Sequence, residues 1–123
     1  LKAGIEFINK KSIQTIKEHE DMLSKTFINK LKEINRVRIY GPLSIKEKTA
    51  VVSFNIKGKD SADIATALDE KYQIMVRVGL HCSPHAHKTI GTFPDGTIRV
   101  SFSIFNTVHE IDYFIDSLKV ILN

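Results

Sequence analysis

The 123-residue sequence has only one cysteine, no tryptophan and only three prolines, and it has no long apolar run. A single thiol cannot form a disulfide within its own chain, which excludes a disulfide-stabilised secreted domain. No apolar run is long enough to cross a bilayer as a helix. The first residues, Leu1 to Ile5, have neither the continuous apolar core nor the cleavage site of a signal peptide. These absences predict a cytoplasmic protein that has no membrane partner.

The sequence also has little excess charge of either sign, with 18 Lys and Arg against 14 Asp and Glu and a net charge of +4. A nucleic-acid interface needs positive charge gathered together with stacking aromatic residues. Here Lys and Glu alternate along the predicted helices, as on a solvated face. Length and composition are those of one globular domain over residues 1–123, without a nucleic-acid partner.

Hydrophobic periodicity predicts a helical first third, with a break near residues 23–25. Its apolar residues recur mostly at spacings of three, four and seven and predict a core-facing stripe, made of Ile5, Ile8, Ile13, Ile16, Leu23, Phe27, Leu31 and Ile34. A second helix begins after an N-cap at Asp60 or Ser61. The last helix follows Asn106 or Thr107, and Glu110 stands at the capping-box spacing from Thr107.

Four apolar segments bounded by Gly and Pro predict strands, at residues 37–40, 49–56, 74–78 and 97–102. The order of elements favours an α+β (two-layer) fold, a small and mostly antiparallel sheet with helices packed on one face. The predicted core residues are Phe27, Leu31, Val52, Phe54, Ile98, Val100, Phe114 and Leu118.

The single thiol, Cys82, lies between the third predicted strand and a short helix begun by Pro84 and continuing to about Lys88. Cations and a helix N-terminus stabilise the thiolate form of cysteine, and Arg77 and His81 precede this residue closely. A reactive nucleophile and an inert buried thiol are both compatible with this pattern, because free cysteine is among the most buried residue types.

Two further histidines follow the cysteine, His85 and His87, and with His81 they raise the alternative of a transition-metal site. The spacing is not a standard zinc pattern, since His81 and Cys82 are adjacent and a second separated ligand pair is missing. We therefore expect no metal.

Several runs of the sequence, taken together, resemble the C-terminal small domain of class V aminotransferases, and most of all the cysteine desulfurase branch. The runs are Arg77-Val78-Gly79-Leu80-His81-Cys82 with Pro84, Ile98-Arg99-Val100-Ser101, Phe105-Asn106-Thr107 and Glu110-Ile111-Asp112, and upstream Tyr40-Gly41-Pro42, Val51-Val52-Ser53-Phe54-Asn55 and Leu68-Asp69. The resemblance covers essentially the whole chain. It departs from the family after the cysteine, at Ser83 and the two later histidines.

The resemblance implies an enzyme that uses pyridoxal 5′-phosphate (PLP), held by a large domain upstream that this chain lacks. Cys82 occupies the position of the sulfur-accepting nucleophile, and Arg99 that of the arginine that binds the substrate carboxylate. Arg77 is a weaker candidate for an assisting substrate contact, with a surface strand arginine as its other interpretation. His81 either tunes the thiol or hydrogen-bonds the loop.

The resemblance also implies an amino-acid substrate, a sulfur-acceptor protein and a homodimeric full-length enzyme. No stretch resembles the family's PLP-binding lysine motif, so we expect the chain alone to bind no PLP and to be inactive. Consistent with this, position 1 is not methionine and the chain opens inside a predicted helix, so we expect a processed chain or a piece of a longer protein. A class V transaminase or lyase that does not use Cys82, and a stand-alone binding domain, remain the alternatives.

Overall fold

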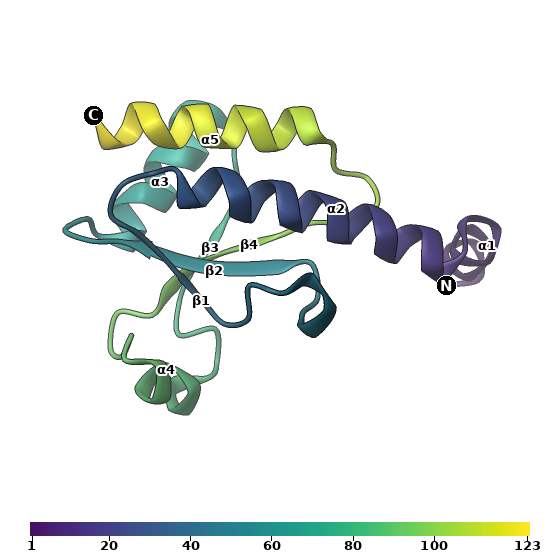
Figure 1. The fold of residues 1–123 in the computed structure, drawn as a ribbon, viewed down its shortest axis with the longest axis horizontal. Coiled ribbons are helices and arrows are strands. Elements are labelled where there is room, and N and C mark those ends of the chain that lie inside the picture. The colour runs from purple at the N-terminus through teal and green to yellow at the C-terminus, as the bar shows by residue number, and fades with distance from the viewer.

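The computed structural model describes all of residues 1–123 (Figure 1). After two consecutive N-terminal helices, strands and helices alternate along the chain. The elements are α1 (Lys2–Lys11), α2 (Ile13–Lys32), β1 (Val37–Tyr40), the 3₁₀ helix η1 (Ile45–Glu47), β2 (Val51–Ile56), α3 (Ser61–Tyr72), β3 (Arg77–Gly79), α4 (Pro84–Ile90), β4 (Thr97–Ser101) and α5 (Val108–Leu122).

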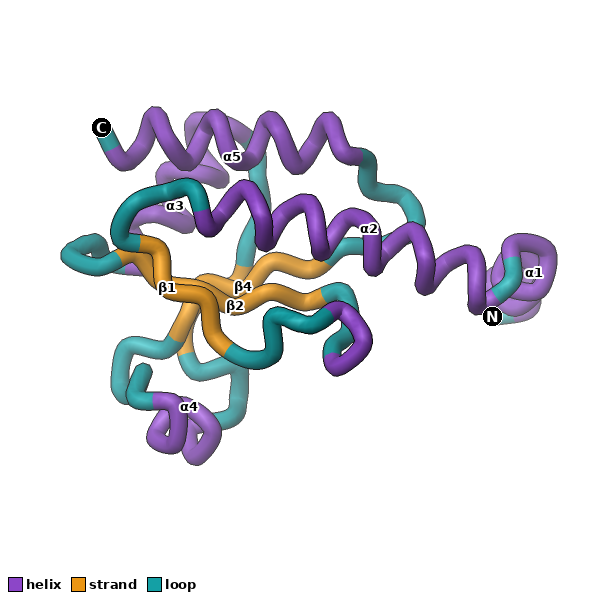
Figure 2. The backbone as a smooth tube through the Cα atoms, viewed as in Figure 1, coloured by secondary structure: helices purple, strands orange, loops and turns teal.

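The four strands form one sheet in the order β1-β2-β4-β3, and every neighbouring pair is antiparallel. Helices α2, α3 and α5 cover one face of this sheet (Figure 1). Helix α4 lies on the other side, connected to β3 and β4 by loops (Figure 2). The predicted α+β fold with helices on one face is confirmed, and the short α4 lies outside that layer, on the opposite side of the sheet.

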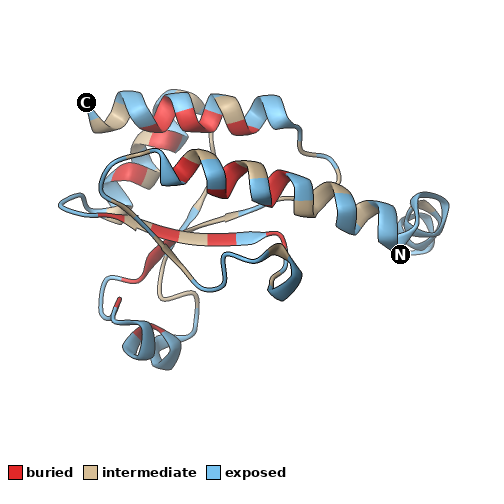
Figure 3. Ribbon diagram, in the orientation of Figure 1, coloured by how far each residue is buried: buried red, intermediate tan, exposed pale blue.

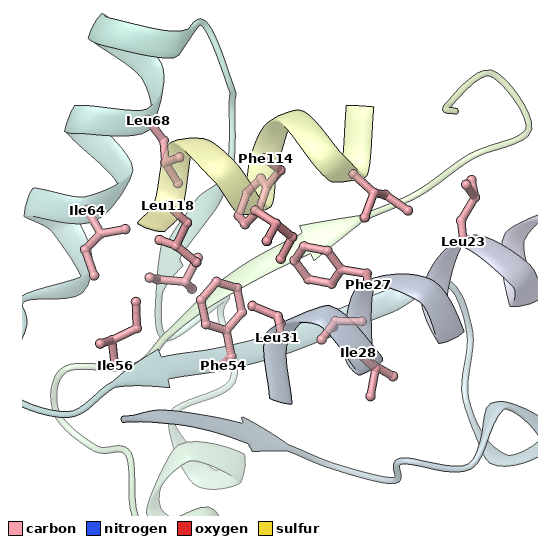
Figure 4. Close-up of a cluster of buried hydrophobic side chains, with 14 residues drawn as sticks. Leu23, Phe27, Ile28, Leu31, Phe54, Ile56, Ile64, Leu68, Phe114 and Leu118 are labelled. Carbon is pink, nitrogen blue, oxygen red and sulfur yellow. The ribbon is translucent and has the colours of Figure 1, made fainter. Parts of the chain in front are cut away.

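The core is a single cluster of 14 buried hydrophobic residues between the sheet and the three covering helices (Figures 3 and 4). Phe27 of α2 is at its centre, with ring centroids 6.2 Å from Phe54 of β2 and 5.1 Å from Phe114 of α5 in edge-to-face geometry. Seven of the eight predicted core residues are buried. The exception, Val100, is half-buried because β3 ends its pairing at Arg99 and leaves the next part of β4 at an open edge.

The first helical third breaks at Ser12 and not at residues 23–25, so that part of the prediction is wrong. Ser12 has φ 69°, and its side-chain oxygen accepts a hydrogen bond from the backbone N–H of Thr15 (3.1 Å), which makes it the N-cap of α2. Helix α1 therefore turns away from the sheet and buries none of its residues. The predicted stripe is buried at its C-terminal end, but Ile5, Ile8 and Ile13 are exposed.

The predicted caps of the later helices are confirmed. Asp60 begins α3 by accepting hydrogen bonds from the N–H groups of the second and third helical residues, at 2.7 and 3.1 Å. Thr107 and Glu110 form the reciprocal capping box at the start of α5. The hydrogen bond that the backbone N–H of Thr107 donates to the Glu110 carboxylate (2.7 Å) lowers the pKa of this group, in keeping with an ionised residue in a first helical turn.

Three of the four strands are shorter than predicted, whereas β1 has the predicted bounds. Of the predicted strand 74–78, only residues 77 and 78 lie in β3 (Arg77–Gly79), because the C-cap of α3 still holds the chain at residue 74. Gln73 takes a left-handed conformation (φ 56°), and the N–H of Ile74 donates to the carbonyl oxygen of Leu68 (3.0 Å). The predicted strands 49–56 and 97–102 are likewise shorter in the structure, as Val51–Ile56 and Thr97–Ser101. Helix α4, in contrast, ends at Ile90, two residues beyond its predicted end.

Replacement of Phe54 by Ala tests the core. Its side chain is fully buried between two aromatic rings, so the truncation should lower the free energy of unfolding by about 3–5 kcal/mol. Phe105→Ala is the matched control, because this phenylalanine is 76% exposed, and it should cost less than about 1 kcal/mol. Urea unfolding of the three proteins measures both values, and similar small losses for the two variants would contradict the packing described.

Candidate functional site

The cysteine loop, residues 80–83, connects β3 to α4 on the side of the sheet that the long helices leave uncovered (Figure 1). Cys82 is a free and exposed thiol. A nucleophile has to be accessible in this way, whereas an inert core cysteine is buried. His81 and Cys82 are consecutive residues in the left-handed region, with φ 50° and 60°. This conformation costs a non-glycine residue about 1 kcal/mol or more, so the surrounding contacts must hold the loop.

Backbone packing at the base of the loop supplies one of these contacts. Gly96 (φ +80°) lies so close to Gly79 that a Cβ atom at Gly96 would stand 2.1 Å from the Gly79 carbonyl carbon. Only glycine fits this approach. The turn that precedes β4 is thereby held directly against the last residue of β3, immediately before the cysteine loop.

Asn55 of β2 holds the same turn from the neighbouring strand, and sequence analysis gave it no role. Its Nδ2 donates to the carbonyl oxygen of Gly96 (2.9 Å), and its Oδ1 accepts from the N–H of Ile98 (3.3 Å) and from the Ser61 hydroxyl (3.3 Å). The signal was present in the sequence, since strand alternation places Asn55 on the face opposite Phe54. What an asparagine contacts on that face depends on which strand lies beside it, and the pairing partner was not predicted.

His81 hydrogen-bonds the loop to β4. Its Nε2–H donates to the carbonyl oxygen of Thr97 (3.1 Å), which leaves Nδ1 buried without a partner. Burial lowers the pKa of His81, and the charge of Arg99 lowers it further, against an opposing effect of the Thr97 hydrogen bond. The neutral imidazole is thus favoured at neutral pH.

The two candidate arginines are direct partners across the sheet, since Arg77 of β3 pairs with Arg99 of β4. Arg99 pairs in turn with Ser53 of β2. Paired residues of an antiparallel sheet project to the same face, here the face without the long helices. Arg77 is exposed, whereas Arg99 is half-buried and its Nε has no hydrogen-bond partner in the chain. Both positive charges lower the pKa of His81.

The later histidines do not join Cys82 in a metal site, and no group of three or more His, Cys, Asp or Glu side chains in the chain is arranged to hold a metal ion. His87 is buried and bonded through Nδ1 to the hydroxyl of Thr92 (2.7 Å), and His85 is exposed. His85 and His87 thus lie in different surroundings, one in solvent and one buried, and they do not form a pair of metal ligands.

The residues of this site do not fit a holder of PLP. A lysine that binds the cofactor covalently has to face the site, and the only lysine of the segment from β3 to β4 is Lys88. It is exposed on α4, with its Nζ 5.1 Å from the ring centroid of Phe93. The side chains gathered near this loop are instead a thiol, an imidazole and two guanidinium groups, those of Cys82, His81, Arg77 and Arg99.

The comparisons with known proteins agree on one family. The class-V aminotransferase family profile matches residues 1–114. A probable cysteine desulfurase of Pyrococcus abyssi is 36% identical over 119 residues, which is 97% of this chain and 29% of that protein. A probable cysteine desulfurase of Streptomyces coelicolor is 33% identical over 123 residues, which is 100% of this chain and 29% of that protein.

A solved structure gives the same result. The apo structure of a cysteine desulfurase from Thermococcus onnurineus superposes with a TM-score of 0.90 at 35% identity, over 97% of this chain and 29% of the other. This chain thus spans less than a third of the length of the relatives it matches.

No helix in the structure has the length and apolar character needed to cross a membrane. From the family profile, the sequence identities and the shared fold together, the chain belongs to the class-V aminotransferase family and is similar to the cysteine desulfurases within it.

Proposed function

We propose that this chain is the C-terminal small domain of a PLP-dependent cysteine desulfurase and that it supplies the sulfur-accepting thiol. The observation that carries the proposal is the exposed Cys82, held in a strained loop on the same side of the sheet as Arg77 and Arg99. Relatives named as cysteine desulfurases over nearly the full length of the chain support it.

In the proposed reaction the Cys82 thiolate attacks the sulfur atom of a cysteine substrate. A bond forms between the two sulfur atoms and the carbon–sulfur bond of the substrate breaks, which leaves a persulfide on Cys82. The electron pair of the broken bond stays on the substrate carbon, which takes up a proton, and the substrate leaves as alanine. An exposed loop suits this task, because the same sulfur has to reach the substrate and then a sulfur-acceptor protein.

Arg99 is proposed to bind the substrate carboxylate. A guanidinium group presents a planar pair of donors that matches a carboxylate. The Nε of Arg99 is buried and has no partner in the chain, so it is available to a ligand at low cost in competing contacts. Arg77, its exposed partner on β3, adds positive charge beside it. The neutral His81 fixes the loop to β4 through Thr97.

PLP, when bound, makes the bonds around the substrate α-carbon labile by accepting electrons from it. Because the residues of this site do not fit a PLP holder, we assign the cofactor to other parts of a longer protein. A homodimeric full-length enzyme and a cytoplasmic location are further parts of this proposal.

A second candidate is a class V transaminase or lyase that leaves Cys82 unused. It is favoured by the family profile, which matches the class-V aminotransferases as a whole and does not select one chemistry. In that case Arg99 keeps its role toward an amino-acid substrate, and Cys82 is a bystander. A stand-alone binding domain would use neither residue in catalysis.

The chain alone should bind no PLP tightly. Titration of the 123-residue chain with PLP, followed by dialysis, should leave no visible chromophore, because the site offers no facing lysine. A weak signal from exposed Lys88 should disappear on dialysis and should be absent from Lys88→Ala. A stoichiometric chromophore that survives dialysis would contradict the assignment of the cofactor to a different part of the protein.

Cys82→Ala in the full-length protein tests the desulfurase proposal. The variant should form no persulfide and release no alanine from cysteine, while its binding of PLP and substrate stays close to that of the unmodified protein. Persulfide labelling and steady-state alanine production measure the effect, and spectral titration with cysteine measures binding. Normal turnover of cysteine by Cys82→Ala would overturn the proposal in favour of an enzyme in which the thiol is incidental.

Arg99→Ala should have a different effect and weaken substrate binding. Loss of a charge-assisted bidentate contact costs about 1.5–3 kcal/mol, which corresponds to a ten- to hundredfold rise or more in the substrate concentration needed. Arg38→Ala is the matched control, because Arg38 lies on the same sheet face but on the far strand β1, stacked over Tyr40 at 5.1 Å. An equal effect of the two substitutions on KM would show that only the general positive charge of the face matters.

A further inference from the structure

The segment that carries Cys82 has no hydrophobic anchor. None of the 14 core residues, and none of the partly buried residues packed against them, lies between Arg77 and Thr97. Helix α4 has seven residues, and the only buried one is a histidine, His87, at 5% exposure. Polar contacts must therefore hold this segment in place, although it contains two strained residues at His81 and Cys82.

His87 and Thr92 are the buried polar pair of this segment. His87 Nδ1 and Thr92 Oγ1 hydrogen-bond at 2.7 Å, and both residues are almost completely shielded from water, at 5% and 6% exposure. A buried hydrogen bond of this kind is costly to break on one side, because the remaining partner is left unsatisfied. The pair is thus a strong local constraint.

Backbone hydrogen bonds connect this pair to both sides of the cysteine loop. The N–H of Thr92 donates to His87 O (2.9 Å), and the N–H of Gly96 donates to Thr92 O (2.6 Å). On the other side, the N–H of His87 donates to Ser83 O (3.3 Å), and the N–H of Ser83 donates to Leu80 O (2.8 Å). Cys82 lies inside the turn that the last of these bonds closes.

The buried pair also lies near His81 of the cysteine loop. The ring centroids of His87 and His81 are 5.8 Å apart, and Nε2 of His81 is hydrogen-bonded to the carbonyl oxygen of Thr97. The charged and titratable groups that act on His81 are Arg99 on β4, Arg77 on β3 and His87 on α4. The position of His87 therefore affects both the conformation and the protonation of the residue next to the thiol.

We propose that His87 and Thr92 act as a positioning pair, whose hydrogen bond holds the loop so that Cys82 is presented in its left-handed conformation. This inference rests on the proposed function in one respect, that Cys82 has a task for which its position matters. The geometric part, that the pair orders residues 80–96, stands on the contacts alone and can be tested without enzyme activity.

The first test uses the 123-residue chain and two substitutions at one site. Thr92→Val keeps the shape of the side chain and removes the hydroxyl, whereas Thr92→Ser keeps the hydroxyl. Thr92→Val should raise the amide exchange rates of Ser83, His87 and Gly96 by about tenfold, since each amide donates within the connected set, and Thr92→Ser should restore them. The free energy of unfolding in urea should fall by the matching amount in Thr92→Val and return in Thr92→Ser, because a native state destabilised relative to local opening is destabilised equally relative to global unfolding.

A His81 titration by NMR separates positioning from general structural support. Burial is the main cause that lowers the pKa of His81, and nearness of His87 adds to it. A loosened loop should therefore raise this pKa toward its ordinary value in Thr92→Val but not in Thr92→Ser. His85→Ala is the control on the same helix, because that side chain is exposed and should leave both exchange and titration unchanged. Exchange rates and a His81 titration that do not change in Thr92→Val would overturn the proposal.

The second test uses the full-length protein. Thr92→Val should lower kcat for alanine release about tenfold with KM unchanged, since the thiol is displaced while the carboxylate site stays intact. Unchanged kcat, in a protein whose Cys82→Ala variant is inactive, would also overturn it. If Cys82→Ala keeps its activity, the desulfurase proposal fails by itself, and the exchange and titration results still decide whether the pair orders the loop.

Discussion

The antiparallel pairing of β2 with β4 is the constraint on which both the core and the site depend. It sets Phe54 beside Ile98 on one face and Ser53 beside Arg99 on the other. Side chains alternate along a strand, so a slip of one residue in this register would turn one of the two strands over relative to the other. Either Phe54 would leave the aromatic cluster with Phe27 and Phe114, or Arg99 would turn toward it. The stability of the domain and the position of its arginine therefore come from the same backbone hydrogen bonds.

The two faces of the sheet are built by different physics. On the helical face, burial of apolar side chains holds α2, α3 and α5 in place. On the other face, three polar or backbone contacts hold the cysteine loop and α4. They are the close approach of Gly96 to Gly79, the hydrogen bond of Asn55 to Gly96, and the buried pair of His87 and Thr92. This division lets Cys82 lie on an exposed segment without weakening the core. It also explains how two left-handed non-glycine residues persist at the site.

Membership of the class-V aminotransferase family sets the chemical context but does not decide the reaction. The family fold carries several chemistries, and the residues that would select among them are the side chains of the cysteine loop and of β4. In this chain those residues form a set without a cofactor-holding lysine and without a metal site. What the set offers is a thiol, a neutral imidazole and two guanidinium groups.

By itself the sequence determined the local elements of this protein. The apolar periods of α2 and α5, the caps at Asp60 and Thr107, and the strands around Phe54 and Ile98 are short-range signals, and the structure confirms them. The motif around Cys82 was also readable as a loop between a strand and a helix, because Gly79 and Pro84 mark its ends.

Only the tertiary structure decided which of these residues meet. The exposure of Ile5 and Ile8 followed from the turn at Ser12, which redirects a helix whose periodicity is otherwise intact. The pairing of Arg77 with Arg99 and the hydrogen bond of Asn55 to Gly96 depend on strand neighbours that are distant in sequence. The burial of His87 is similar, since a histidine on a polar helix carries no local sign of being buried. Periodicity reports which face of an element is apolar, whereas the partner on that face is set by the packing of the whole chain.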